Sequence, residues 1–167
     1  MQRLFSRTLL LLLGGLVVTG MVAPTMAQDE SVQIARVKYG GGGDWYSDEE
    51  SLVELLAFAR QHTLLDVGQQ EATVELTSDK MFTYPYLYLT GHGNVTFSPA
   101  EADRLRRYLL QGGFLHIDDN YGLDEYIREE LKKVFPEKEL VELPFDHPIY
   151  NTRYTFSDGL PKIHEHD

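Results

Sequence analysis

The sequence predicts an α/β protein in which a mostly parallel sheet carries helices on both of its faces. Short segments rich in strand-forming residues alternate along the chain with amphipathic helical segments, which is the pattern of strands joined by right-handed crossovers. No internal repeat or low-complexity linker interrupts this alternation, so residues 28–167 are expected to form one domain.

The N-terminal part of this domain contains two predicted strands and one helix. Residues 32–38 alternate apolar and polar side chains, as a strand does, and the glycines at 40–43 end it. Ser47 and Glu50 have the spacing of a capping box, which predicts the start of a helix. The apolar stripe of this helix consists of Leu52, Leu55, Leu56 and Ala59. Residues 73–76 predict a short peripheral strand.

A second strand and helix follow. Residues 86–90 are apolar and rich in strand formers. Ser98 and Glu101 form another capping box, with Pro99 at the first helical position, where its missing N–H costs nothing. The buried stripe of this helix consists of Ala102, Leu105 and Leu109. Gly112 is its expected C-terminal stop.

The next segment contains a third strand and helix. Residues 114–117 are nearly all apolar, which predicts a central parallel strand buried on both faces, with His116 as a hydrogen-bonded core histidine. The following helix carries acids in its first turn and lysines in its last, as the helix dipole favours. Its buried stripe consists of Leu123, Ile127, Leu131 and Val134. Residues 140–143 predict the last strand.

Residues 1–27 have the order of features found in a secretory signal peptide. Two arginines precede a mostly apolar run at 9–22, and Thr25 and Ala27 are small residues at the positions that a signal peptidase reads. The run contains glycines and is shorter than the roughly 18–20 apolar residues of a spanning helix. We therefore expect cleavage after Ala27, a mature chain of residues 28–167 without a membrane span, and a periplasmic or secreted location.

Charge and cysteine content exclude several classes of function. The chain has 15 basic and 26 acidic residues, and two of the basic ones lie in the predicted signal peptide, so the mature part carries a net charge of −13 with neutral histidines. A field of this sign repels nucleic acid and anionic lipid surfaces. The absence of cysteine excludes disulfides and the lipid attachment of a lipoprotein.

Polar and aromatic residues crowd the predicted carboxyl ends of three strands, in loops at 40–46, 91–94 and 118–122. Open α/β sheets bind ligands at this edge. The candidate ligand-binding residues are Gly42, Asp44, Trp45, Tyr46, His92, Asn94, Asp118, Asp119, Asn120 and Tyr121. The glycine run matches neither the dinucleotide-binding nor the P-loop fingerprint, and it predicts a connection rather than a phosphate cradle.

Two residues of these loops are candidates for catalysis. His92, between two glycines, can serve as an acid, base or metal ligand, and Asp119 can serve as a base. Asp118 and Asp119 also suit a hard divalent cation, although both are equally well explained as turn-forming residues. His164 and His166, two positions apart, are further candidate metal ligands. These residues identify no cofactor, and a divalent metal stays open.

Four segments of the sequence resemble a family of bacterial domains of unknown function that is placed with the class I glutamine amidotransferase-like fold. They are RVKYGGGGDWY at 36–46, YLTGHGN at 88–94, GGFLHIDDNYG at 112–122 and LPFDHPIY at 143–150. Part of the last segment, Asp146 to Ile149, is also similar to trehalose-utilisation-type proteins. The resemblance implies a flavodoxin-like sheet, and a C-terminally truncated one, because domains of the family extend beyond the position of Asp167.

The resemblance does not imply the amidotransferase reaction. In those enzymes a nucleophilic cysteine follows a central strand, where this sequence has the segment 118–120, and the His-x-Glu partner pattern is replaced by His164 and His166. Cysteine-dependent amidotransferase activity is therefore excluded. The first hypothesis is that the domain binds a small polar, carbohydrate-like ligand at the strand ends. The alternatives are a cell-envelope scaffold that binds another protein, and a hydrolase using Asp119 and His92 with or without a metal.

Overall fold

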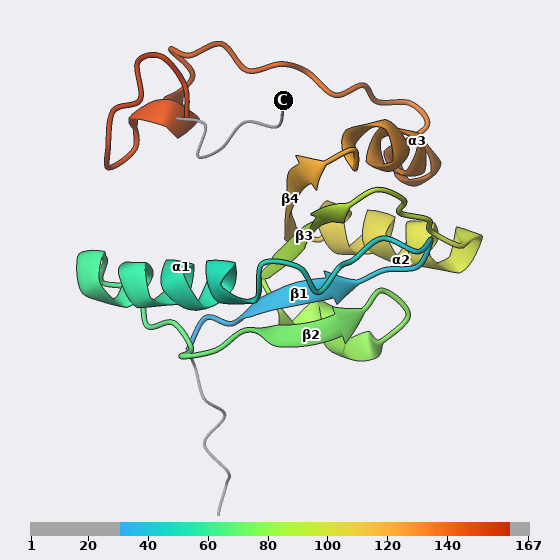
Figure 1. Cartoon of the computed structure of the whole chain (residues 1–167), viewed down its shortest axis with the longest axis horizontal. Helices are drawn as coiled ribbons and strands as arrows, with labels where there is room; N and C mark the ends of the chain where they lie inside the picture. Colours follow the sequence, from blue (N-terminus) through green and yellow to red (C-terminus); the bar gives the residue numbers. More distant parts are fainter. Residues whose placement is uncertain (1–30, 161–167) are drawn as a thin grey trace, which may run out of the picture.

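Four parallel strands form the sheet in the order β2-β1-β3-β4 (Figure 1). The computed structural model describes residues 31–160, so the predicted signal peptide and the pair His164 and His166 lie outside the described part of the chain. The elements are β1 (Ile34–Lys38), α1 (Glu49–His62), β2 (Ala72–Glu75), the 3-10 helix η1 (Asp79–Thr83), β3 (Tyr86–His92), α2 (Pro99–Leu110), β4 (Phe114–Tyr121), α3 (Asp124–Val134) and the 3-10 helix η2 (Pro148–Asn151).

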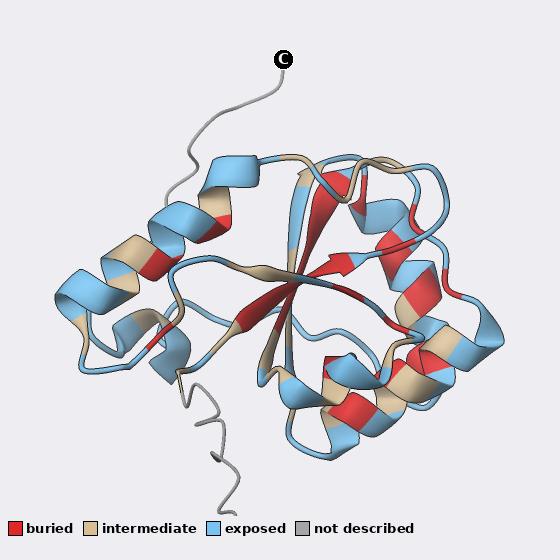
Figure 2. Cartoon of the chain, turned by 90° about the horizontal axis from the view of Figure 1, so that it is seen from below, coloured by how far each residue is buried: buried red, intermediate tan, exposed pale blue. Residues whose placement is uncertain are grey.

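The helices cover both faces of the sheet, as the sequence predicts. On one face, Leu52 and Leu56 of α1 pack with Ile34 of β1 and Tyr88 of β3. On the other face, α2 and α3 lie side by side and form the larger core with the inward side chains of β1, β2 and β3. Figure 2 shows the buried residues along the middle strands and on the sides of the helices that face them. The parallel sheet and its order are compatible with a flavodoxin-like fold.

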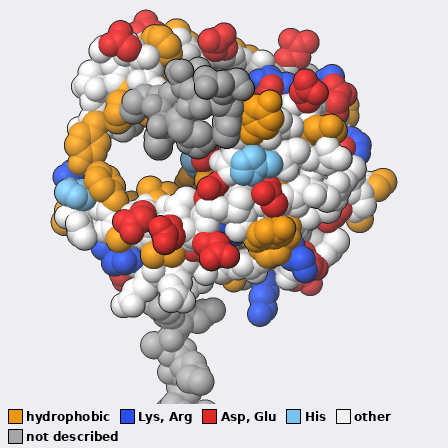
Figure 3. All heavy atoms as spheres, in the orientation of Figure 1, with side chains coloured by type: hydrophobic (Ala, Val, Ile, Leu, Met, Phe, Trp, Pro, Cys, Tyr) orange, Lys and Arg blue, Asp and Glu red, His pale blue; other side chains and the backbone are white. Residues whose placement is uncertain are grey.

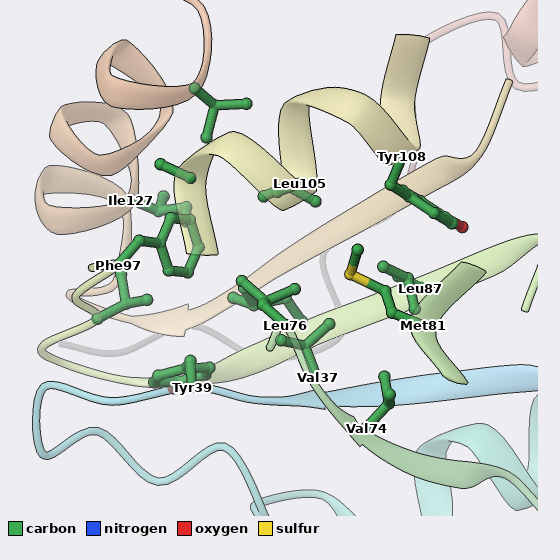
Figure 4. Packing of buried hydrophobic residues seen from close by; sticks show 14 of the residues in the cluster. Val37, Tyr39, Val74, Leu76, Met81, Leu87, Phe97, Leu105, Tyr108 and Ile127 are labelled. Atoms are coloured by element: carbon green, nitrogen blue, oxygen red, sulfur yellow. The ribbon is translucent and has the colours of Figure 1, made fainter. Parts of the chain in front are cut away.

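The larger core is built from residues that the periodicity of the sequence places inward. Val37, Leu87, Leu89 and Leu105 are fully buried, and Figure 4 shows side chains of the sheet meeting those of α2 in the layer between them. Complete burial of one such leucine or valine contributes about 1.5–3 kcal/mol. This layer packs against β1 and β3, whose carboxyl ends lead into residues 40–46 and 91–94.

The two predicted capping boxes have different outcomes. At α2 the box is present, because Ser98 Oγ accepts the N–H of Glu101 and the Glu101 carboxylate accepts the N–H of Ser98. At α1 the predicted box is wrong. The N-cap is Asp48, with a φ of 54° and no side-chain cap. The Ser47 hydroxyl instead accepts the Asn120 amide, and the buried Arg36 guanidinium donates to the backbone carbonyls of Ser47 and Asp48. Leu55, predicted to be buried, is 40% exposed.

The prediction that residues 114–117 form a central strand is also wrong. They begin β4, which is the last strand of the sheet in the described part of the chain, and Phe114 is 51% exposed. Residues 140–143, the predicted last strand, have no regular structure, and Val141 is 77% exposed. His116 is hydrogen-bonded as predicted, to the Tyr86 hydroxyl, but it lies on the open face of an edge strand rather than in the core.

No helix in the range 31–160 has the length and apolar character needed to cross a membrane.

Candidate functional site

The three segments named from the sequence meet at one edge of the sheet. β3 runs on to His92 and β4 to Tyr121, so parts of the loops predicted at 91–94 and 118–122 belong to strands. β3 and β4 stay paired to their carboxyl ends, where Gly91 lies beside Asp119 and His92 beside Tyr121. The loop after β1 joins them through the pairing of Gly40 with Thr96. We call this edge, formed by residues 40–46, 91–96 and 118–122, the rim. The fold therefore brings together the segments that carry all ten candidate residues.

Backbone hydrogen bonds fasten the glycine loop to its neighbour. The N–H of Thr96 donates to the carbonyl of Gly40 (2.9 Å), and the N–H of Gly43 donates to the carbonyl of Asn94 (2.9 Å). The Gly43 donor is thereby used within the protein. Gly42 is exposed and has open space around its Cα.

At Gly91 the backbone of β3 lies closer to neighbouring atoms than at any other glycine of the rim. Its φ of +143° is unfavourable for residues with a side chain. A Cβ at this position would also overlap the hydroxyl of Tyr39 and press on the Asp44 carboxylate. The Tyr39 hydroxyl donates to the carbonyl of Thr90 (3.1 Å), and burial, followed by the charge of Asp44, raises the pKa of Tyr39 to about 12. Tyr39 is therefore a neutral hydrogen-bond donor, and its hydroxyl packs against the backbone of Thr90 and Gly91.

A carboxylate–imidazole pair lies at the centre of the rim. Asp44 Oδ1 accepts the backbone N–H of His92 (2.5 Å), and Asp44 Oδ2 lies 3.1 Å from Nδ1 of the His92 ring. Burial raises the pKa of Asp44, but the backbone and side-chain hydrogen bonds from His92 outweigh it and bring the pKa below its ordinary value. The His92 side chain is 46% exposed, and its Nε2 has no partner in the described part of the chain. One nitrogen of the imidazole is thus held while the other faces solvent.

The aromatic residues of the rim differ in exposure. Trp45 is partly buried and packs against the core, with its ring edge-to-face on Tyr46 at a centroid distance of 5.6 Å. Tyr46 is 59% exposed and Tyr121, next to His92 in the strand register, is 63% exposed. The rim therefore presents the exposed ring of Tyr46 together with the His92 imidazole.

The two aspartates in the carboxyl half of β4 diverge. Asp119 accepts the backbone N–H groups of Leu123 (2.8 Å) and Asp124 (3.1 Å), and so stabilises the start of α3. Asp118 points to the other face and accepts the hydroxyl of Tyr88 (2.8 Å). Asp119 and His92 are neighbours in the rim, but the carboxylate that contacts His92 is Asp44.

Asn120 connects the rim to the start of α1. Its side-chain amide donates to the carboxylate of Asp48 and to Ser47 Oγ (3.2 Å), and its carbonyl accepts the Thr90 hydroxyl (3.4 Å). Asn94 is exposed, and its backbone carbonyl accepts the N–H of Gly43. Of the ten candidates, Asp44, Asp118, Asp119 and Asn120 thus have polar side-chain groups engaged within the fold, as does Nδ1 of His92.

Arg36 is a supporting residue that sequence reasoning did not single out. It is 3% exposed and donates to the carbonyls of Ser47 (2.6 Å) and Asp48 (3.0 Å) and to Glu71 (3.1 Å). Its guanidinium also lies 5.6 Å from the ring centroid of Tyr88. The available signal was an arginine in the middle of an apolar strand, because a charge in that position needs buried partners.

Metal chemistry has limited support from these side chains. No group of three or more histidine, aspartate or glutamate side chains within residues 31–160 is arranged to hold a metal ion. Asp44 and His92 are two such ligands side by side. On the face shown in Figure 3, acidic side chains lie around an exposed histidine. Cavities of about 500 and 480 Å³ lie along α3 and between α2 and α3, and no rim residue lines either.

Comparison with known proteins places the chain in a family. A search of curated proteins returned no match. Residues 33–167 match the family model described as domain of unknown function DUF4159, which covers β1 and every later element of the structure. The chain belongs to the DUF4159 family of domains of unknown function.

Proposed function

We propose that the rim binds a small, polar, uncharged ligand of the carbohydrate type. The observation that carries the proposal is the Asp44–His92 pair, which holds an imidazole whose Nε2 has no partner within residues 31–160, in the same rim as the exposed Tyr46 ring. Open α/β sheets bind ligands at this edge.

The chemistry of these groups favours a sugar over an anion. The C–H faces of a sugar pack on aromatic rings, and its hydroxyls donate to carboxylates and exchange hydrogen bonds with imidazole. The net charge of the mature chain, with Asp44, Asp118 and Asp119 all in or beside the rim, disfavours phosphates and other anions. A neutral polyol avoids this repulsion.

Titration calorimetry of the purified protein against a panel of neutral sugars tests the proposal. At least one sugar should bind, and Tyr46→Ala and His92→Ala should each weaken it about tenfold or more, as loss of one stacked ring or one hydrogen bond to a polar ligand does. Tyr126→Ala, which removes a 43% exposed tyrosine from α3, is the matched control and should leave binding unchanged. No heat with any sugar would refute the proposal.

A hydrolase is the second candidate function, and the same pair favours it. A carboxylate on Nδ1 orients the imidazole and leaves Nε2 to take a proton from water or a hydroxyl, which is the arrangement of a general base. In this version Asp44 replaces Asp119 as the partner of His92, because Asp119 is committed to α3. The test is hydrolysis of a chromogenic ester and glycoside panel, with elemental analysis for bound metal. Activity that survives both Asp44→Asn and His92→Ala would exclude this role.

Location and the wider fold relationship are also proposals. The N-terminal sequence supports export to the periplasm or beyond, and the order β2-β1-β3-β4 supports a relationship to the amidotransferase-like fold. Mass spectrometry of the protein recovered from the cell envelope fraction should show a chain that begins at Gln28. An envelope scaffold is favoured instead if a stable protein partner is captured and the rim variants still bind it.

A further inference from the structure

The ring of His92 has the kind of support that metal-binding histidines have. Its Nδ1 lies 3.1 Å from Asp44 Oδ2, and its Nε2 has no partner within residues 31–160. A histidine that binds a metal almost always donates its other ring N–H to a carboxylate, a backbone carbonyl or water, which fixes the ring and its tautomer. The other oxygen of Asp44 accepts the backbone N–H of His92, so the ring and the main chain are fixed by one side chain.

His92 differs in this respect from the other histidines of the described chain. Of the four histidines within residues 31–160, it alone has a carboxylate at its ring. The rings of the others have different contacts: His62 with the Phe58 ring, His116 with the Tyr86 hydroxyl and His147 with the N–H of Ile149.

A metal site at His92 needs ligands from outside residues 31–160, because no three histidine, aspartate or glutamate side chains within this range are arranged to hold a metal ion. The remaining histidines of the chain are His164 and His166. Side chains two positions apart lie on the same face of an extended segment. The match to the family model runs to residue 167, so both histidines belong to the same domain as the rim.

The chain is long enough to bring these two histidines to the rim. After α3 it runs back to α1, where the Tyr154 ring lies 6.2 Å from the Phe58 ring (Figure 1). Asp48, at the start of α1, contacts Asn120 of the rim, and the ten positions from Asp48 to Phe58 measure about 15 Å along the helix. The ten positions from Tyr154 to His164 span up to about 33 Å, which exceeds this distance.

We propose that the rim holds a divalent transition-metal ion of the zinc type, bound by His92 Nε2, His164 and His166, with Asp44 as the partner of the His92 ring. Three imidazoles and one open position for water are a recurrent arrangement of tetrahedral zinc. Without cysteine, imidazole is the ligand through which this chain selects zinc over harder cations. The strongly acidic chain also attracts a cation.

The metal site shares the rim with the proposed function but does not depend on a sugar binding there. It deepens the hydrolase candidate, because a zinc ion in such a site activates a bound water. Metal binding is measured without sugar or substrate. Failure of the metal site and failure of sugar binding can therefore be told apart.

The protein, purified without a histidine tag and freed of metal by dialysis against EDTA, is to be titrated with Zn²⁺ in competition with a chromophoric chelator. We expect one ion per chain. Asp44→Asn should weaken binding about tenfold to a hundredfold, the usual effect of removing the partner of a metal-binding histidine. His92→Ala, His164→Ala and His166→Ala each remove a ligand and should weaken binding further than that. His62→Ala, which removes an exposed histidine from α1, is the control and should leave binding unchanged.

Nuclear magnetic resonance of the histidine ring nitrogens is a second measurement that does not depend on the variants folding. Zn²⁺ should shift Nε2 of His92 and one ring nitrogen of each C-terminal histidine, and should leave the rings of His62 and His116 unchanged. No binding of Zn²⁺, binding that survives His92→Ala, or shifts confined to other histidines would each overturn the proposal. A hydrogen bond from His92 Nε2 to another side chain that persists at saturating Zn²⁺ would overturn it too.

Discussion

The carboxylate of Asp44 holds both the backbone and the ring of His92. One oxygen accepts the backbone N–H at 2.5 Å, and the other lies 3.1 Å from Nδ1, across a separation of 48 positions in the sequence. Two loops that follow different strands are joined through this one side chain. The position of the imidazole in the rim therefore depends on Asp44 as well as on β3.

Replacing Asp44 by asparagine should change how stability depends on pH. The pKa of this carboxyl is lower in the folded protein than its ordinary value of 3.8, so its ionised form favours folding. That contribution is present above pH 3.8 and is lost as the pH falls through the folded-state pKa. Urea unfolding at several acidic pH values should show a steeper loss for the wild type than for Asp44→Asn.

The control for that experiment is Asp103→Asn on α2, which removes one negative charge from an exposed pair with Arg107. It should leave the acid limb of the stability curve as steep as in the wild type. Equal flattening by both variants would mean that net charge, and not the contact with His92, causes the effect.

Asp119→Ala should destabilise the protein by about 1 kcal/mol, the usual cost of losing a side-chain acceptor at a helix start. Its carboxylate receives two backbone N–H groups in the first turn of α3. Glu125→Ala removes an exposed acid from the same turn and should cost less. Both values come from chemical denaturation. A fully stable Asp119→Ala variant would contradict the structural role given to this residue.

Glu130 should be the most costly acid to remove from α3. It is 6% exposed, accepts the backbone N–H of Phe97 (2.7 Å) and pairs with Lys133 (2.7 Å). Glu130→Ala leaves a buried donor without a partner and should lower the free energy of unfolding by about 2 kcal/mol or more. Glu129→Ala, which breaks an exposed pair with Lys132, should cost less than about 0.5 kcal/mol. Similar melting temperatures for the two variants would be inconsistent with this assignment.

Two glycines of the rim should respond differently to alanine. Gly42 has a φ of +95° and open space, so Gly42→Ala should cost only the backbone strain of about 1–2 kcal/mol. Gly91→Ala meets the Tyr39 hydroxyl as well and should cost about 2–5 kcal/mol. Thermal unfolding of the two variants measures the difference. Equal melting temperatures would show that the packing of Tyr39 under Gly91 is not restrictive.

Local patterns in the sequence predicted most elements of the fold. The Ser98–Glu101 box, the apolar stripes of α2 and α3 and the strands at 86–90 and 73–76 follow from short-range periodicity and capping. The failures involve long-range partners. An apolar run such as 114–117 is compatible with a central strand and with an edge strand. The two differ in whether a second strand pairs with the outer side, which the run itself does not encode.

That the three candidate segments meet at one edge was predicted from the sequence, but the pairing of their side chains was not. Strand-end loops identify the rim, because all parallel strands end at one edge. That His92 contacts Asp44 rather than Asp119 depends on the path of the glycine loop, which no local signal specifies. The failure of the Ser47 box has a similar cause, since Asn120 of β4 donates to the Ser47 hydroxyl from a distant element.

The fastening of the glycine loop has an energetic consequence. A run of four glycines would lose much conformational entropy if it became ordered only around a bound molecule. Here the hydrogen bonds from Gly43 to Asn94 and from Thr96 to Gly40 order the loop when the protein folds, so this entropy is lost before any molecule binds. The rim is preorganised, so a molecule that binds there keeps more of its contact energy as affinity.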